Sequence, residues 1–232
     1  MNKGRFGAIP LCKTLLLAAG LWLAGPANLQ AETVPETADP KASEATSTQD
    51  AQALQQLLGK LQSLTGRFTQ TLSDPAGEVL QESHGEFAIE RPGKFYWHTF
   101  EPFEQLLVSN QETLWLYDPD LEQVTVRPFD ERLQQTPALI LSGDLQTLSD
   151  SFDIHRKAEA EQDFVLTPRG EQSLFASLSL TFTAGELTDM RLLDSLGQET
   201  HFALLGVQQN PALADGKFQF EAPPGTDVLI DE

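Results

Sequence analysis

The feature that most constrains the fold is a long series of short segments in which apolar and polar residues alternate. The first runs from residue 64 to 72, where one face of an extended strand carries Leu64, Gly66, Phe68, Gln70 and Leu72. Similar segments follow near 79–90, 94–99, 105–109, 113–117, 122–127, 163–168, 173–183, 186–193, 198–207 and 217–221. Turn signals such as Pro92-Gly93 and Leu196-Gly197 separate them. The sequence therefore predicts one antiparallel sheet of about 11 strands, which is long enough to curl.

The clearest strand is 173–183. Its apolar face is predicted to carry Leu174, Ala176, Leu178, Leu180 and Phe182, which alternate with Ser173, Phe175, Ser177, Ser179 and Thr181.

Helical patterns occur at two places. Leu54, Leu57, Leu58 and Leu61 have the spacing of one helix face, and Asp50 is a suitable N-cap. After the sixth strand, Thr136-Pro137 and Gly143 bracket a short apolar helix over 138–142, and a second short helix is expected near 145–150.

These helices are too small to fill the hollow of so long a sheet. We therefore expect an apolar cavity on its concave face. An ordinary filled β-barrel fits the alternation equally well.

The N-terminus has the pattern of a secretory signal peptide: Lys3, Arg5 and Lys13, then the uncharged run 15–23, then small residues. Cleavage is expected after Ala31, with Ala27 as the alternative. Cys12 precedes the apolar run, whereas a lipidated cysteine would follow it. Residues 32–49 are predicted to be a disordered spacer, because Val34 is their only large apolar residue. Residues 50–232 then form a single domain, and the protein is expected in the periplasm as a monomer.

The charge excludes some partners. The formal net charge is −19, and loss of the three basic residues in 1–31 makes it −22. Such an acidic protein is not expected to bind nucleic acid or anionic membrane surfaces. Among the four histidines, no two have the spacing of metal ligands on one element, and the G-x-S-x-G, G-x-G-x-x-G and P-loop motifs are absent. We expect no catalytic residues, no metal and no cofactor.

Arg91 is the one charged residue that draws attention, because it lies between a predicted strand and the aromatic start of the next. Its five donors need acceptors if it is buried. The alternative is a solvated arginine in a turn.

Several segments, taken in order, resemble the LolA family of periplasmic outer-membrane lipoprotein carriers. They are Gly66-Arg67-Phe68-Thr69-Gln70, the run 85–97 (GEFAIERPGKFYW), 105–109 (QLLVS), 114–119 (LWLYDP), 122–125 (EQVT), Thr136-Pro137 and 163–168 (DFVLTP). The resemblance covers nearly all of residues 50–225.

This resemblance implies a half-open β-barrel whose apolar cavity, closed by a helical lid, shelters lipoprotein acyl chains. The chain would take lipoproteins from an inner-membrane ABC transporter complex like LolCDE and deliver them to an outer-membrane receptor like LolB. By the same resemblance Arg91 is the lid latch, and Phe68, Phe95 and Trp97 line the cavity. The lid helix would comprise Ala138, Leu139, Ile140 and Leu141.

Three alternatives stay open. The first is an outer-membrane lipoprotein receptor of the same fold, against which the position of Cys12 speaks. The second is a periplasmic lipid-binding sensor with a similar half-barrel. The third is an acyl hydrolase.

Overall fold

A computed structural model describes residues 40–129, 141, 145–157, 162–170, 173 and 175–231. The chain divides into a unit of residues 1–37, which lies outside these ranges, and a unit of residues 38–232. Within the described residues, no helix is both long and apolar enough to cross a membrane. The predicted signal peptide and the spacer up to residue 39 also lie outside the described residues.

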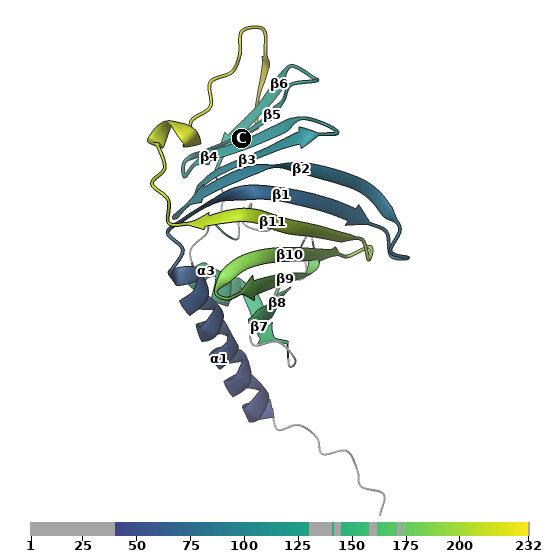
Figure 1. Ribbon diagram of the computed structural model, residues 1–232, viewed down its shortest axis with the longest axis vertical. Coiled ribbons are helices and arrows are strands. Elements are labelled where there is room, and N and C mark those ends of the chain that lie inside the picture. Colours follow the sequence, from purple (N-terminus) through teal and green to yellow (C-terminus); the bar gives the residue numbers. More distant parts are fainter. Residues whose placement is uncertain are drawn as a thin grey trace, which may run out of the picture. The chain divides into compact units, whose positions relative to one another are not determined.

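The second unit is built on one curved, open sheet (Figure 1). Its strands are β1 (Ser63–Ser73), β2 (Val79–Glu90), β3 (Lys94–Glu101), β4 (Gln105–Asn110), β5 (Thr113–Asp118), β6 (Gln123–Pro128), β7 (Phe152–Arg156), β8 (Asp163–Pro168), β9 (Phe175–Thr183), β10 (Glu186–Asp194), β11 (Glu199–Gln209) and β12 (Asp227–Ile230). Their order across the sheet is β12-β6-β5-β4-β3-β2-β1-β11-β10-β9-β8-β7. The predicted mainly-β class and the curved antiparallel sheet are confirmed.

The sheet has 12 strands rather than about 11, and two strands were missed. β7 is short and directly follows the helix α3 (Leu145–Ser151), which lies where the second short helix was expected. Among the described strands, β12 and β6 form the one parallel pair, and the run Val228-Leu229-Ile230 of β12 has no alternation to reveal it.

The strand predicted over 217–221 is wrong. Residues Asp215–Phe218 form a 3₁₀ turn, η2, instead. The turn places Phe218 against the outer face of the sheet, where its side chain is 1% exposed.

The prediction for strand 173–183 holds only in part. Leu178, Leu180 and Phe182 are buried as expected, but near the start Phe175 is buried and Ala176 is exposed. Leu193 pairs with Ser177 whereas Asp194 pairs with Phe175, so the register shifts by one residue there. Such a bulge exchanges the two faces of a strand.

The first helix, α1 (Pro40–Gly59), is longer than predicted. Asp50 is not its N-cap, because the helix begins ten residues earlier, and residues 40–49 of the predicted spacer are helical. The leucine stripe was placed correctly, since Leu54, Leu58 and Leu61 are at most 1% exposed. Each such side chain contributes about 1.5–3 kcal/mol on burial.

The extra length of α1 covers the open edge of the sheet at β7. Ser47 Oγ donates a hydrogen bond to the carbonyl of Ile154 (3.4 Å), and the backbone N–H of Arg156 donates to the Asp50 carboxylate (2.9 Å). Arg156 Nε also lies 3.6 Å from Asp50. An exposed strand edge invites pairing with other chains, so these contacts protect it.

The segment after β11 makes a second apolar layer on the convex face. Phe218 is buried there, and the ring centroids of Tyr117 and Phe220 are 5.2 Å apart. Lys217 Nζ lies 3.5 Å from the centre of the Tyr96 ring. Residues 211–226 thus cross the outside of β3–β5 and lead to β12 at the edge next to β6.

Candidate functional site: the concave face

The cross-strand register sorts the concave face into rows, because directly opposed residues project to the same side of a sheet. One row contains Leu64, Ile89, Phe95, Ser109, Leu114 and Arg127. The next contains Gly66, Phe87, Trp97, Leu107, Leu116 and Thr125. The first five residues of the first row are at most 1% exposed. The concave face is therefore dry and apolar, and driest along this first row.

An aromatic cluster occupies the middle of this face. The rings of Phe68 and Trp97 are stacked with centroids 4.1 Å apart, and Phe95 stacks on Trp97 at 6.1 Å. Phe87 and Phe202 lie 5.6 Å from Trp97. The structure thus brings together all three predicted cavity residues. Phe87 was not among the predicted cavity residues, although it lies two residues before Ile89 and therefore on the same face of β2.

Two glycines make room for these rings. A Cβ on Gly85 would collide with the carbonyl oxygen of His98 and lie 2.7 Å from Cζ of Phe68. A Cβ on Gly66 would lie 2.9 Å from Cε1 of Phe87. Because Phe68 pairs with Gly85 and Phe87 with Gly66, each ring lies over the bare backbone of the neighbouring strand. The two glycines are therefore part of the site.

Helical residues cover the concave face. Leu54 and Leu58 of α1, Leu148 of α3 and Leu141 belong to the same buried cluster as Phe68 and Trp97. Leu141, the last predicted lid residue, is helical and 1% exposed. The other predicted lid residues, Ala138, Leu139 and Ile140, lie outside the described residues.

Arg91 lies in the β2–β3 turn, next to the driest row. Its backbone N–H donates to the carbonyl of Gln62 (2.8 Å), which ties the turn to the segment after α1. The side chain is half-buried, and its Nε and Nη2 atoms are inaccessible to solvent. The guanidinium is thus not that of a solvated turn arginine.

Two polar residues of the driest row were missed by sequence reasoning. Ser109 is fully buried, and its hydroxyl donates to the carbonyl of Gly93 (3.0 Å), which holds the β2–β3 turn against β4. Arg127 lies opposite Leu114, and its Nε is buried. The alternation of β6 gave no signal for Arg127, because Val124 and Val126 lie on the other face of the strand and make the Arg127 face look like the solvent side.

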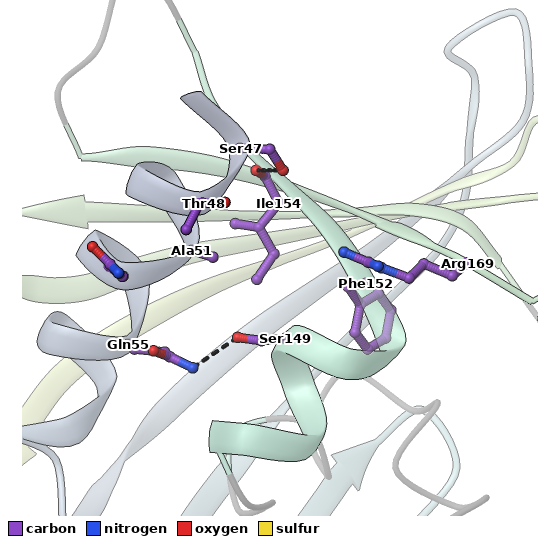
Figure 2. A pocket seen from close by; sticks show the side chains of 9 residues that line it. Ser47, Thr48, Ala51, Gln55, Ser149, Phe152, Ile154 and Arg169 are labelled. Carbon is purple, nitrogen blue, oxygen red and sulfur yellow. Dashed lines mark hydrogen bonds between the residues drawn. The ribbon is translucent and has the colours of Figure 1, made fainter. Parts of the chain in front are cut away.

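A separate pocket of about 280 Å³ lies between α1, α3 and β7 (Figure 2). It is lined by Ser47, Thr48, Ala51, Gln52, Gln55, Ser149, Phe152, Ile154 and Arg169. Gln55 Nε2 donates to Ser149 Oγ across it (2.7 Å), and Arg169 pairs with Asp153 (3.1 Å). Hydrocarbon would leave these polar groups without water, so this pocket is not a site for an acyl chain.

Charged groups gather on the convex face instead. Burial, aided by the nearby Glu86 carboxylate, raises the pKa of Tyr96 to about 12. A hydrogen bond to Glu90 raises the pKa of Lys94, and the Asp215 carboxylate adds to this. The two faces of β3 therefore differ: hydrocarbon on the concave side, ion pairs on the convex side. Among the described residues, no group of His, Cys, Asp or Glu could hold a metal ion.

Comparison with protein-family models identifies the family of this chain. The model for the outer membrane lipoprotein carrier protein LolA matches residues 59–221. The chain belongs to this family. The outer-membrane lipoprotein carrier protein of Azotobacter vinelandii is 51% identical over 179 residues, which cover 77% of this chain and 86% of that protein. The protein of the same description from Pseudomonas fluorescens is 48% identical over 202 residues, 87% of this chain and 94% of its own length.

A match among solved structures is less similar in sequence to this LolA-family chain. A putative outer membrane lipoprotein-sorting protein domain from Vibrio parahaemolyticus is 12% identical, with a TM-score of 0.46, and covers 74% of this chain and 97% of its own.

Proposed function

We propose that this protein is a periplasmic carrier that binds the acyl chains of lipoproteins and catalyses no reaction. The observation that carries the proposal is the dry concave face, where Phe68, Phe87, Phe95 and Trp97 are buried in one cluster with helical side chains. Membership of the LolA family supports the same cargo.

The energetics suit a carrier. Each exposed CH₂ group costs about 0.8 kcal/mol in water, so removing a 16-carbon chain from water is favourable by on the order of 10 kcal/mol. The concave face offers hydrocarbon and aromatic contact without any group that must react. Helical side chains fill this space, so the acyl chain enters only when side chains such as Leu141 and Leu148 move away from the concave face.

Cargo would come from an inner-membrane ABC transporter complex and pass to an outer-membrane receptor. Release then requires that the closed form compete with the bound chain. We assign that role to Arg91, a half-buried residue of the β2–β3 turn whose backbone N–H donates to the carbonyl of Gln62, just after α1. Hydrogen bonds to a charged donor contribute about 1.5–3 kcal/mol each, enough to favour closing without preventing binding.

The first test is to purify the protein from periplasm and identify bound lipoproteins by mass spectrometry. The proposal predicts acylated lipoproteins in stoichiometric amounts. Recovery without lipoprotein, together with turnover of a lipid ester, would favour the hydrolase.

A second test addresses Arg91. Arg91→Leu is expected to bind lipoprotein at least as well as the parent but to transfer it at least about tenfold more slowly, since the loss of one to two hydrogen bonds changes an equilibrium by that factor. Arg67→Leu, at an exposed position on β1, is the matched control. Normal transfer by Arg91→Leu would show that Arg91 is not the latch.

A further inference from the structure

Apart from Val228, Leu229 and Ile230 on the edge strand β12, exposed apolar side chains collect at one end of the sheet. The hairpins β1–β2, β3–β4, β5–β6 and β10–β11 all turn at this end, because neighbouring strands are antiparallel (Figure 1). Their tips carry Val79 (61% exposed), Leu80 (52%), Phe103 (67%), Leu121 (67%) and Leu196 (78%). We call these five residues the hairpin rim.

The opposite end of the sheet differs. There the described turns contain Arg91-Pro92-Gly93, Gln111-Glu112 and Ala184-Gly185, and none of them carries a large exposed apolar residue. Single exposed apolar residues are normal on a protein surface, but their concentration at one end marks an interaction site.

Side-chain to backbone hydrogen bonds brace the tips of β1–β2 and β10–β11. Asp74 Oδ1 accepts the backbone N–H groups of Ala76 (2.9 Å) and Glu78 (2.8 Å), and Asp194 Oδ1 accepts those of Leu196 and Gln198 (both 2.8 Å). A Cβ on Gly197 would lie 3.4 Å from Cγ of Pro75, so these two tips touch. The apolar side chains are therefore presented in fixed positions, which lowers the entropy lost on docking.

The charge around the rim indicates the partner. Residues 74–80, 100–104, 118–122 and 193–198 contain no lysine or arginine, and Glu78, Glu101, Glu104, Asp120 and Glu122 are exposed among them. An anionic lipid surface would repel such a rim. A protein surface with apolar pockets bordered by lysine and arginine would match both properties.

We propose that the hairpin rim docks on a basic protein surface of this kind, belonging to a protein that loads or unloads the carrier. The inference rests on the proposed carrier function. It adds the surface at which transfer partners are met and separates that surface from the acyl site, since Phe103 and Leu196 lie outside the buried cluster.

The test combines Phe103→Ser with Leu196→Ser in the mature chain. The control is Leu205→Ser, which removes an equally large side chain, 47% exposed, from the middle of β11. Binding is measured to the purified periplasmic part of the lipoprotein-releasing transporter and to the soluble part of the receptor. It is also measured to vesicles of phosphatidylethanolamine and phosphatidylglycerol (3:1). A fluorescent palmitoyl probe reads the acyl site separately.

We expect the double variant to lose at least about tenfold in affinity for one or both proteins, as substitution of anchor residues does. The control should bind like the parent. All three should bind the palmitoyl probe alike and leave the vesicles unbound. Asp120→Asn with Glu101→Gln should weaken the same protein complex and reduce its dependence on salt.

Equal binding of the double variant and the parent to the proteins would overturn the inference. So would absence of protein binding by the parent while the palmitoyl probe still binds. If the parent bound the vesicles and the double variant did not, the rim would be a membrane-binding surface instead. Failure of the parent to bind the palmitoyl probe would count against the carrier function itself.

Discussion

At the scale of single residues, glycine decides whether the aromatic cluster can form. Gly85→Ala places a methyl group against the His98 carbonyl oxygen and the Phe68 ring, so β3 or the ring must shift. We expect a loss of about 1–3 kcal/mol in the free energy of unfolding, as for other overpacked cores. Urea denaturation measures it.

The control for this prediction is Gly216→Ala, because a Cβ there meets no atom within 4 Å. This change should alter stability by no more than about 0.5 kcal/mol. If both variants were equally stable, the rings would not require the bare backbone of β2.

Tyr96 is the residue whose titration reports on the convex layer. Its pKa is raised to about 12, so folding favours the neutral phenol. The stabilisation is complete below the ordinary value of 10 and is lost as the pH rises through 12. The ultraviolet titration curve of the parent, after subtraction of the curve of Tyr96→Phe, should show one phenol ionising near pH 12. A midpoint near 10 would mean that residues 211–226 do not cover the ring.

At the same scale, Phe68, Phe95 and Trp97 were predicted from the resemblance to the LolA family, and the alternation of β1 by itself placed only Phe68 on an apolar face. Ser109 and Arg127 were not predicted, because a polar residue on the inner face becomes recognisable only when the register across β4–β6 is known.

At the scale of elements, α1 protects the edge of the sheet at β7 through the hydroxyl of Ser47 and the buried carboxylate of Asp50. Asp50 is 8% exposed and accepts from the Arg156 N–H. Asp50→Ala leaves that donor without its acceptor, which costs about 1–3 kcal/mol. We expect lower stability in urea and faster hydrogen exchange at the Arg156 amide.

Asp50→Asn keeps an acceptor oxygen and removes the charge. It should therefore retain most of the protection at the Arg156 amide. Unchanged exchange in Asp50→Ala would show that α1 does not cover β7 in solution.

Elements were predictable where the pattern is local. The leucine stripe of α1 and the alternating strands β1–β6 follow from residue spacing alone. β12 pairs with β6 over about a hundred intervening residues, and the pairing leaves no mark in Val228-Leu229-Ile230. The early start of α1 depends on contacts of Ser47 and Asp50 with β7, which is equally distant in sequence.

At the scale of the whole molecule, the sheet separates two tasks. Its concave face gathers the largest apolar side chains under the helices, and its hairpin end presents apolar residues to other proteins. The sequence predicted the curved sheet. That helical side chains from α1, α3 and Leu141 close over the aromatic cluster depends on tertiary packing, which no local pattern encodes.

Photocrosslinking tests the central claim most directly. In one variant a photoreactive amino acid replaces Leu116, which lies on the concave face of β5. In a matched variant it replaces Trp115, the neighbouring residue on the convex face. Both positions are half-buried, so accessibility does not separate them. In the presence of a triacylated lipoprotein, position 116 should crosslink to its acyl chains and position 115 should not. Equal crosslinking at both positions, or crosslinking at 115 alone, would contradict an acyl site on the concave face.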